Sequence, residues 1–388
     1  MSEQSGKSYD AVVVGGGVIG LSCAWAAVRR GARVKVLDRA RLGTGATAVA
    51  AGMLAPVGEL SFGEPRLLEM TLAAAGRYPA FIAELENAVG RETPIDYRRC
   101  GALHLALDRD EAAQLHRVHE LQRSLGLEAE WLAPRGCREL EPALAPSLAG
   151  GVHAPSEAAV DPSLLVEALV EACGTERFRY QLGGAVTELL TDGDRVAGVR
   201  TDSGEVRART VVVATGAWSG QLDWLPEEVR PPVRPVKGQI LTLRAHDGVM
   251  PTERILASER VYLVPRPRER QIVVGATTEE RGFDTTVTAG GVHELLREAY
   301  RLLPEVAEME LVRSVAGLRP GTPDNLPLVG PTTMDGLLMA TGHYRNGILL
   351  GPLTGEAVAE LADTGRVSEA LAAASPSRFD APVAGALR

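Results

Sequence analysis

The first forty residues alternate short apolar runs with one longer helical pattern. Asp10–Gly15 is a short apolar run typical of a buried strand, and Arg33–Asp38 is a second such run. Between them, Gly17–Arg30 has the length and apolar spacing of a helix, with Gly31 as its C-cap. This order predicts a strand–helix–strand unit at the start of the chain.

Apolar periodicity predicts the remaining elements. The predicted helices cover residues 67–89, 111–125, 162–173 and 351–363. The predicted strands cover 102–107, 186–190, 195–201, 210–214, 239–243, 261–264, 271–276 and 337–341. Residues 186–201 are expected to form a hairpin, and the strands between 239 and 276 have an antiparallel pattern. Residues 39–56 are rich in Gly, Ala and Thr, which predicts neither a regular strand nor a surface helix.

Nucleotide-binding patterns occur at three separated places in the chain, and 388 residues exceed what one hydrophobic core usually serves. We therefore predict an α/β fold with a Rossmann-type domain of discontinuous segments, plus an α+β substrate domain with an antiparallel sheet. The predicted boundaries are 8–75, 155–222 and 312–368 for the nucleotide domain and 76–154 and 223–311 for the substrate domain. Residues 369–388 are expected to form a loose tail.

Composition and charge exclude several classes of function. A net charge of -9 disfavours nonspecific nucleic-acid binding, which needs a positive field. The start of the chain has no signal-peptide pattern, and no apolar stretch approaches the length of a membrane span. We expect a soluble cytoplasmic protein with no nucleic-acid or membrane partner. No C-x-x-C pair occurs among the four cysteines, which predicts neither a metal site nor a disulfide framework: Cys23, Cys100, Cys137 and Cys173.

A G-x-G-x-x-G motif lies between the first predicted strand and helix. Gly15 permits the tight turn, Gly17 lets the backbone approach a pyrophosphate, and Gly20 lets the helix pack close to the strand. The free N–H groups at the helix start, including those of Val18 and Ile19, would face the phosphates. Asp38 ends the second strand, where an acid binds ribose hydroxyls and disfavours a 2′-phosphate. The motif predicts a dinucleotide other than NADP.

Three later segments decide between FAD and NAD. Taken singly, 41–47 also fits a flexible loop and 213–219 an ordinary buried strand with a turn. The segment 342–352 lies between a strand and a helix, where amides could stabilise negative charge on a reduced flavin. Their order along the chain favours FAD, bound noncovalently because no cysteine lies in the flavin-ring segments. The candidate contacts beyond the glycine loop are Arg39, Thr44, Gly45, Ala46, Thr47, Ala51, Gly52, Met53, Val186, Thr215, Gly216, Trp218, His343, Arg345, Asn346, Gly347 and Ile348.

Four longer motifs resemble the D-amino-acid oxidase–type flavoproteins, and within them the glycine oxidases of thiamine biosynthesis. The motifs are AAGMLAP at 50–56, VYLVPR at 261–266, AGLRPGTPD at 316–324 and GHYRNGILL at 342–350. The resemblance runs from about residue 8 to 368. It implies an FAD-dependent amino-acid oxidase that uses O₂ and releases H₂O₂.

The resemblance also implies roles for site residues. Arg319 would pair with the substrate carboxylate, as a planar guanidinium can through two parallel hydrogen bonds. Tyr262 would add a hydroxyl to the same carboxylate, Arg345 would lie at the pocket mouth, and Met53 would line the pocket. His343 is expected to be structural or to lie at the flavin edge, since hydride transfer from an amine needs alignment and a neutral amine more than a side-chain base.

Several alternatives stay open. Glycine oxidases can carry Met at the position of Thr278, so glycine, sarcosine and a small D-amino acid all remain candidate substrates. Lys237 lies either near the flavin or in a solvated turn. A dehydrogenase of the same fold with another electron acceptor is the second hypothesis, and a non-catalytic flavin-binding subunit is the third. A homo-oligomer is expected from the frequency of such assemblies.

Overall fold

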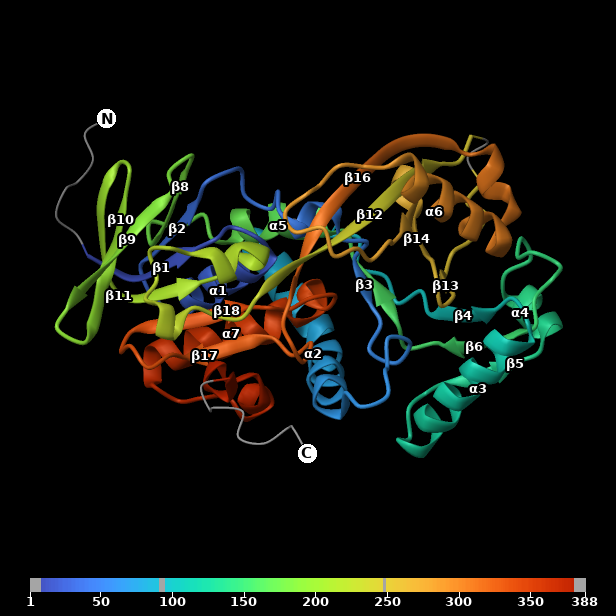
Figure 1. The fold of residues 1–388 in the computed structure, drawn as a ribbon, viewed down its shortest axis with the longest axis horizontal. Coiled ribbons are helices and arrows are strands. Elements are labelled where there is room, and N and C mark those ends of the chain that lie inside the picture. The colour runs from blue at the N-terminus through green and yellow to red at the C-terminus, as the bar shows by residue number, and fades with distance from the viewer. Residues whose placement is uncertain (1–7, 91–94, 247–248, 380–388) are drawn as a thin grey trace.

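The predicted strand–helix–strand unit is present in the computed structural model, which describes residues 8–90, 95–246 and 249–379 (Figure 1). Strands β1 (Tyr9–Val14) and β2 (Val34–Asp38) are parallel, and helix α1 (Val18–Arg29) connects them. The β-branched and apolar side chains of the two strands are buried on both faces, as parallel sheets require. The fold class predicted from this pattern is therefore confirmed.

The first sheet holds these two strands at its centre. Its order is β17-β18-β11-β1-β2-β8, and β10 and β9 extend it from the outer part of β11. The predicted hairpin at 186–201 is present as this antiparallel pair. The further strands of this sheet are β8 (Phe178–Leu182), β9 (Val186–Asp192), β10 (Arg195–Thr201), β11 (Gly204–Val213), β17 (Leu328–Pro331) and β18 (Leu337–Thr341).

Helix α7 (Gly347–Thr364) packs directly on α1, and the two lie side by side in Figure 1. A Cβ on Gly355 would stand 2.5 Å from the Ser22 carbonyl oxygen, so only glycine permits this close approach. Helices α2 (Pro65–Val89) and α5 (Pro162–Ala172) complete the layer around the apolar core of this half. Asp161 caps α5 by accepting hydrogen bonds from two backbone N–H groups.

The second sheet has the order β16-β12-β15-β14-β13-β4-β6-β5 and is mostly antiparallel. Its long strands β12 and β16 run from the middle of the molecule into this half (Figure 1). The strands are β4 (Ala102–Ala106), β5 (Glu130–Leu132), β6 (Gly150–Ala154), β12 (Arg234–Arg244), β13 (Ile255–Ala257), β14 (Tyr262–Arg266), β15 (Gln271–Gly275) and β16 (Glu310–Gly321). The helices of this half are α3 (Arg109–Ser124), α4 (Pro134–Leu140) and α6 (Ala289–Leu302), and a short pair, β3 (Met53–Leu54) and β7 (Ala158–Ala159), lies between the sheets.

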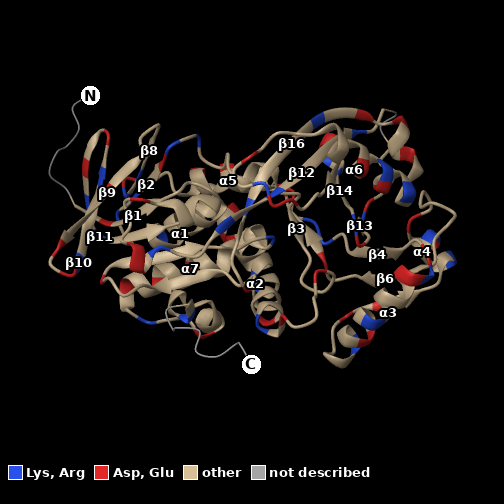
Figure 2. Ribbon diagram, in the orientation of Figure 1, with Lys and Arg blue, Asp and Glu red and all other residues tan. Residues whose placement is uncertain are grey.

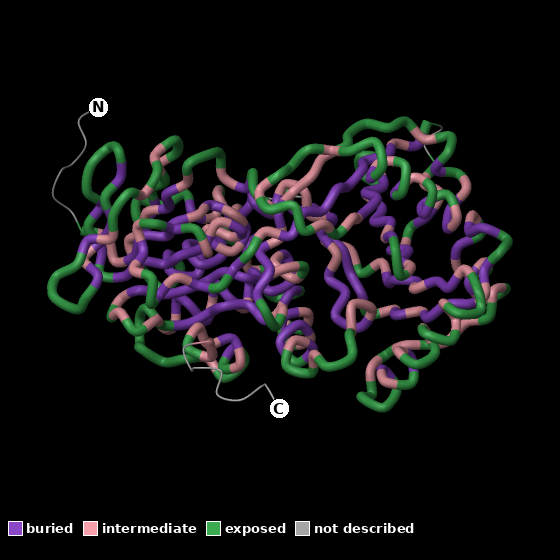
Figure 3. The backbone as a smooth tube through the Cα atoms, viewed as in Figure 1, coloured by how far each residue is buried: buried purple, intermediate pink, exposed green. Residues whose placement is uncertain are grey.

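Burial and charge follow these layers. The central strands β1, β2 and β18 of the first sheet run through the buried interior in Figure 3, whereas β8 and β9 are largely exposed. Charged residues gather on outer elements, including α3 and α6, whereas α1 has a single charged residue, Arg29, and the first half of α7 has none (Figure 2). This distribution agrees with α1 and α7 packing against each other and the sheet.

Two elements near the C-terminal end differ from the prediction. Helix α7 begins at Gly347 instead of at the predicted residue 351. Pro352 lies inside the helix and does not mark its first turn. Pro352 removes the N–H that would bond the Ile348 carbonyl, and the Tyr78 hydroxyl donates to that oxygen instead, at 3.3 Å. In place of a loose tail from 369, residues 369–379 form two 3₁₀ turns with Leu371 and Ala374 buried. The remainder of the predicted tail, 380–388, lies outside the described residues.

The exact domain boundaries stay a proposal. Strand β16 begins at Glu310 and pairs along its length with β12 of the second sheet, although its C-terminal end leads into β17 of the first. Helix α2 is continuous across residue 75 and packs with α5 and α7. The chain thus passes between the two halves within regular elements as well as at loops.

Candidate functional site

One large cavity, of ≈ 1410 Å³, lies between the two halves of the described chain. Its walls come from the glycine loop, residues 37–67, the turn after β11, strands β12, β14 and β16, and the turn before α7. The volume exceeds the range of about 300–1,000 Å³ common for small-ligand pockets. It therefore has room for an extended cofactor together with a small substrate.

The site residues predicted from the sequence lie around this cavity, with Gly20 the one exception. A Cβ on Gly20 would stand 1.9 Å from the Gly15 carbonyl oxygen, so this glycine keeps α1 close to β1. Gly15 has φ of 110°, and its Cβ would stand 2.2 Å from the Ala214 carbonyl oxygen on the neighbouring strand segment. Both positions accept glycine alone for steric reasons.

The first helix N-terminus opens onto the cavity. Gly17 is the N-cap of α1 and supplies no side-chain cap, but the Val18 N–H that was expected to face the phosphates is taken by Thr47, so the N–H of Ile19 is the predicted donor that remains for a ligand. Val18 N donates to Thr47 Oγ1 at 3.1 Å, which fixes the 44–47 segment against the helix start. The Asp38 carboxylate is held by the N–H groups of Gly16 (2.7 Å) and Ala40 (2.8 Å), and each oxygen keeps capacity for a ribose hydroxyl.

A second helix N-terminus, that of α7, faces the same cavity. Its N-cap, Asn346, makes no side-chain cap, and Gly347 and Ile348 line the wall. His343 is 2 % exposed, and its Nε2 lies 2.9 Å from Thr354 Oγ1. Burial lowers the pKa of His343 to about 3, so the imidazole is neutral at physiological pH. The positive end of α7 and the Arg345 guanidinium, not the histidine, are then the sources of positive potential at this wall.

These features fit a dinucleotide flavin. Two uncapped helix N-termini suit a pyrophosphate and an electron-rich ring, and the glycine loop leaves space for a close backbone approach. Trp218 lines the cavity between them, and the Arg39 guanidinium stacks on its ring at 4.2 Å. The remaining predicted contacts at 44–53, 186, 215–216 and 345 also line the wall.

Arg319 projects from β16 on the cavity face of the second sheet. Its Nη1 donates to the carbonyl oxygens of Thr277 at 3.1 Å and of Lys237 at 3.5 Å. The guanidinium lies above Gly238 of the neighbouring strand, where a Cβ would stand 2.4 Å from Nη2. The two acceptors leave other N–H groups of the guanidinium for a carboxylate.

Tyr262 lies on the same face, directly opposite Gly275 in the pairing of β14 with β15. A Cβ on Gly275 would stand 2.3 Å from the Tyr262 hydroxyl, so this glycine makes room for the ring. Burial raises the pKa of Tyr262, with the Arg319 charge acting in the opposite direction. The phenol therefore stays protonated at neutral pH and can donate a hydrogen bond.

Gly238→Ala is expected to displace the Arg319 guanidinium without unfolding the protein. The new methyl group would meet the flexible end of a side chain, not the backbone. We expect the KM for a carboxylate substrate to rise by roughly tenfold or more, because the displacement removes about one charge-assisted hydrogen bond to the carboxylate. Steady-state kinetics and flavin content would measure this effect. Gly290→Ala, where a Cβ meets nothing within 4 Å, is the control. Equal kinetics for the two variants would contradict the placement of Arg319.

Two further predicted residues, Arg345 and Met53, lie on the cavity wall near Arg319 and Tyr262. Tyr344 N donates to the Pro320 carbonyl at 3.0 Å, which places the 343–346 turn and hence Arg345 beside β16. Met53 of β3 is partly exposed in the cavity wall and also packs with apolar side chains. Both side chains line the end of the cavity that contains Arg319.

Glu59 is the acidic side chain that sequence reasoning missed. It lines the cavity and is partly buried, and burial raises the pKa of its carboxyl against the opposing effect of Arg345. Its loop is fixed because Gly58 N donates to the buried Glu157 carboxylate, which also lies 3.4 Å from His104 Nε2. The position of Glu59 three residues after the 50–56 motif was the one available signal.

Within the parts of the chain that the structure describes, no three or more His, Cys, Asp or Glu side chains form a group suited to a metal ion. Over the same residues, no helix combines the length and apolar character needed to cross a membrane. The four cysteines are free thiols, and three of them are buried.

Comparisons with known proteins identify the family and the fold. Residues 10–361 match the family model described as FAD dependent oxidoreductase. The chain is 35% identical over 357 residues to a glycine oxidase of Geobacillus kaustophilus, covering 92% of this chain and 93% of that protein. A crystal structure of glycine oxidase from Geobacillus kaustophilus superposes with a TM-score of 0.89 at 34% identity, covering 96% of this chain and 100% of that one.

Two other relatives carry different names. The chain is 38% identical over 354 residues to a bifunctional protein ThiO/ThiG of Nostoc sp., covering 91% of this chain but 52% of that protein. It therefore spans about half the length of that relative. It is also 32% identical over 385 residues to the hydrogen cyanide synthase subunit HcnC of Pseudomonas aeruginosa, covering 90% of this chain and 91% of the subunit.

Proposed function

The chain belongs to the family of FAD dependent oxidoreductases, and on this premise we propose that it catalyses the oxidative deamination of a small amino acid, with glycine as the favoured substrate. The products would be the α-keto acid, glyoxylate for glycine, together with H₂O₂ and either ammonia or, from an N-methylated substrate such as sarcosine, an amine. A non-catalytic flavin-binding role does not agree with membership of this enzyme family.

The observation that carries the proposal is the pairing of Arg319 and Tyr262 on one face of the second sheet. Both line the cavity that the glycine loop and α7 enter from the other side. A fixed guanidinium beside a protonated phenol is suited to a carboxylate. Glu59 supplies an acidic group near these cations, so the charges around this end match those of an amino-acid zwitterion.

Each residue then has a stated part in the reaction. FAD, when bound, would supply a two-electron acceptor for the hydride of the substrate α-carbon, with O₂ as the final oxidant. Arg319 and Tyr262 hold the carboxylate and so orient the α-carbon in the cavity. The N–H groups of Gly347 and Ile348 stabilise negative charge next to the α7 N-terminus. The imine product would form no bond to the protein, and it would hydrolyse in water.

No side chain on the cavity wall needs to act as a strong base. His343 has a pKa of about 3 and is engaged with Thr354, so it is a poor proton acceptor at neutral pH. The neutral form of the substrate amine is the reactive one, and Glu59, whose pKa burial raises against the opposing effects of Arg345 and Arg319, is the side chain that would accept a proton from the ammonium form. This division agrees with the expectation that alignment, not general base catalysis, is the main contribution of the protein.

Thr278 extends the range of substrates that we propose. It lines the cavity together with Ala276 at the edge of the substrate end. A short polar side chain at this position leaves more space than a methionine would. Sarcosine and small D-amino acids such as D-alanine are therefore included beside glycine.

Anaerobic reduction of the bound flavin would test the proposal. The holoenzyme is mixed without oxygen with glycine, sarcosine, D-alanine or D-proline, and the loss of flavin absorbance is followed. We expect rapid bleaching by at least glycine or sarcosine, and H₂O₂ release once air is admitted. Failure of all four compounds to reduce the flavin would reject the proposal.

A dehydrogenase is the second candidate, and the similarity to the subunit named HcnC favours it. The same substrate site would serve both reactions, so the electron acceptor alone distinguishes them. Bleaching without subsequent H₂O₂ release would favour the dehydrogenase. The expected part in thiamine biosynthesis, the cytoplasmic location and the homo-oligomer all remain predictions.

A further inference from the structure

Strand β12 has two faces at its substrate end. Gly238 and Ile240 line the cavity, whereas the intervening Lys237 and Gln239 point to the opposite face and are each 1 % exposed. Lys237 is therefore neither a cavity residue nor in a solvated turn. A lysine buried to this extent requires a reason, because its ammonium group is costly to remove from water.

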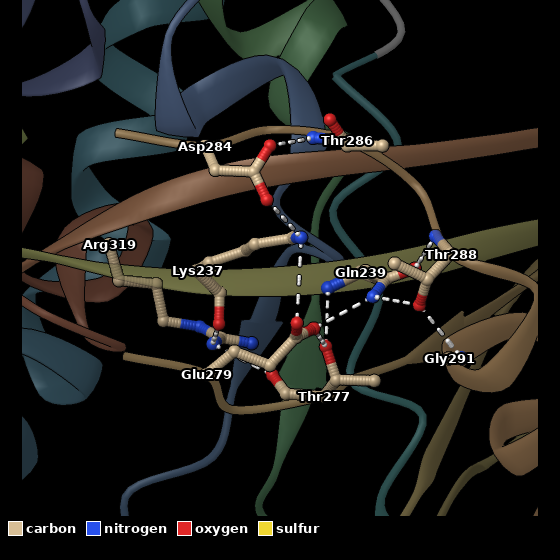
Figure 4. A network of polar contacts seen from close by, with 9 residues as sticks. All are labelled: Lys237, Gln239, Thr277, Glu279, Asp284, Thr286, Thr288, Gly291 and Arg319. Atoms are coloured by element: carbon tan, nitrogen blue, oxygen red, sulfur yellow. Dashed lines mark hydrogen bonds and ion pairs between the residues drawn. The ribbon is translucent and has the colours of Figure 1, made fainter. Parts of the chain in front are cut away.

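The chain after β15 continues alongside β12 as an irregular strand. Lys237 and Glu279 exchange backbone hydrogen bonds of 2.9 Å in both directions, and Thr277 N donates to the Gln239 carbonyl at 3.3 Å. Side chains alternate here as well. Ala276 and Thr278 line the cavity, and Thr277 and Glu279 lie on the back face with Lys237 (Figure 4).

Polar contacts tie the back face together (Figure 4). Lys237 Nζ lies 3.4 Å from Glu279 Oε2 and 3.1 Å from Asp284 Oδ2. Glu279 Oε1 accepts hydrogen bonds from Thr277 Oγ1 at 2.6 Å and from Gln239 Nε2 at 2.7 Å. Gln239 Oε1 in turn accepts from Thr288 N at 2.9 Å, next to the start of α6. Both Glu279 and Asp284 join the lysine to the 277–288 segment, and Glu279 alone also contacts Thr277 and Gln239.

The same segment holds the substrate arginine. Arg319 Nη1 donates to the backbone carbonyl oxygens of Thr277 and Lys237. The side chains of these same two residues contact the Glu279 carboxylate. The guanidinium is therefore oriented by backbone whose position depends on the network behind it. A shift of this backbone would also move Thr278 in the cavity wall.

We propose that Lys237 and Glu279 are a positioning pair that, from behind the sheet, sets the Arg319 guanidinium for the substrate carboxylate. The proposal rests on the proposed function, because it assigns Arg319 the carboxylate. The paired charges keep the 276–279 segment against β12 at a place where β15 has already ended. Removal of Lys237 leaves the Glu279 carboxylate without its cation, and removal of Glu279 leaves the buried ammonium with Asp284 alone; in both cases the 276–279 segment loses its ionic tie to β12.

Three variants of the holoenzyme test this pair. Lys237→Met and Glu279→Gln each remove one charge at similar side-chain volume, and Asp284→Asn is the matched control. Asp284 also pairs with Lys237, but it is partly exposed and its other contact is with Thr286, away from Arg319. The measurements are the KM and kcat for glycine, the flavin content, and the dissociation constant of acetate. Acetate binding is monitored through the change in flavin absorbance.

We expect Lys237→Met and Glu279→Gln to raise both the KM and the acetate dissociation constant by about tenfold. We expect kcat and flavin content to stay within about twofold, because neither residue touches the reacting atoms or the cofactor wall. Asp284→Asn should resemble the wild type in all four quantities. If Lys237→Met does not accumulate as holoenzyme, Glu279→Gln decides the question.

Three outcomes would overturn the proposal. Wild-type constants in Glu279→Gln would show that Arg319 does not depend on the pair. An equal rise in Asp284→Asn would show a general effect of charge around Lys237. A wild-type enzyme that neither binds acetate nor is reduced by glycine would reject the carboxylate site and the proposed function together, whereas the first two outcomes leave the proposed function intact.

Discussion

Arg319→Ala is expected to abolish most of the substrate affinity while FAD stays bound. Truncation of one partner in a desolvated charge pair costs about 2–5 kcal/mol, which is roughly 30-fold to several thousandfold in affinity. The KM should rise by a factor in this range, because the guanidinium of Arg319, a residue of β16, faces the substrate end of the cavity. The cofactor wall is formed by other segments, so the flavin content should not change. Steady-state kinetics and flavin absorbance measure the two effects.

Arg313→Ala is the matched control for this prediction. Arg313 lies on the same strand, six residues earlier, and its side chain is exposed outside the cavity. Its removal should leave the KM within about twofold, as surface substitutions usually do. An Arg319→Ala enzyme with an unchanged KM would show that the carboxylate binds elsewhere. Loss of flavin in Arg319→Ala would show that the arginine serves the cofactor.

Gly15→Ala should remove the flavin from the protein. Gly15 has φ of 110°, and the added Cβ would stand 2.2 Å from the carbonyl oxygen of Ala214. This atom belongs to backbone that pairs β11 with β1, so it cannot move aside without disturbing the sheet. Strain and overpacking together amount to roughly 2–6 kcal/mol. We expect the ratio of flavin to protein absorbance to fall by at least about tenfold.

Gly31→Ala separates strain from steric overlap. Gly31 follows α1 with φ of 89°, and a Cβ there would meet nothing within 4 Å. This variant therefore carries the backbone strain without the collision, and it should keep its FAD and lose only a little thermal stability. If Gly15→Ala retained flavin as well as Gly31→Ala does, the close approach of β1 to the turn after β11 would not be required for binding.

Local patterns predicted those elements whose cause is local. The periodicity of α1, the Asp161 cap of α5 and the apolar run of β18 each depend on a few neighbouring residues, and each lies within about one residue of the prediction. The start of α7 was misplaced because Pro352 indicates a helix boundary by itself. The compensating hydroxyl of Tyr78 comes from a distant helix and leaves no local signal.

Strand β16 shows the same limit at the substrate site. Its motif indicated an arginine with a role, but the first half of the strand has exposed apolar residues, Leu311 and Val312, that fit no core face. The strand forms because it pairs with β12 along its whole length, and that pairing places Arg319 above Gly238. Glu59 was missed for a related reason, since its chemistry depends on Arg345 and the buried Glu157 from distant segments.

The sequence by itself determined the dinucleotide loop and the elements with a strong local pattern, and it supplied the motifs through which Arg319 and Tyr262 became the predicted carboxylate ligands. These properties follow from backbone conformation, helix capping and side-chain chemistry, which act over a few residues. Only the tertiary structure decided how Arg319 is oriented and on which side of the sheet Lys237 lies. The register of β12 against β16 and the 276–279 segment controls both, and register results from contacts between residues far apart in the chain.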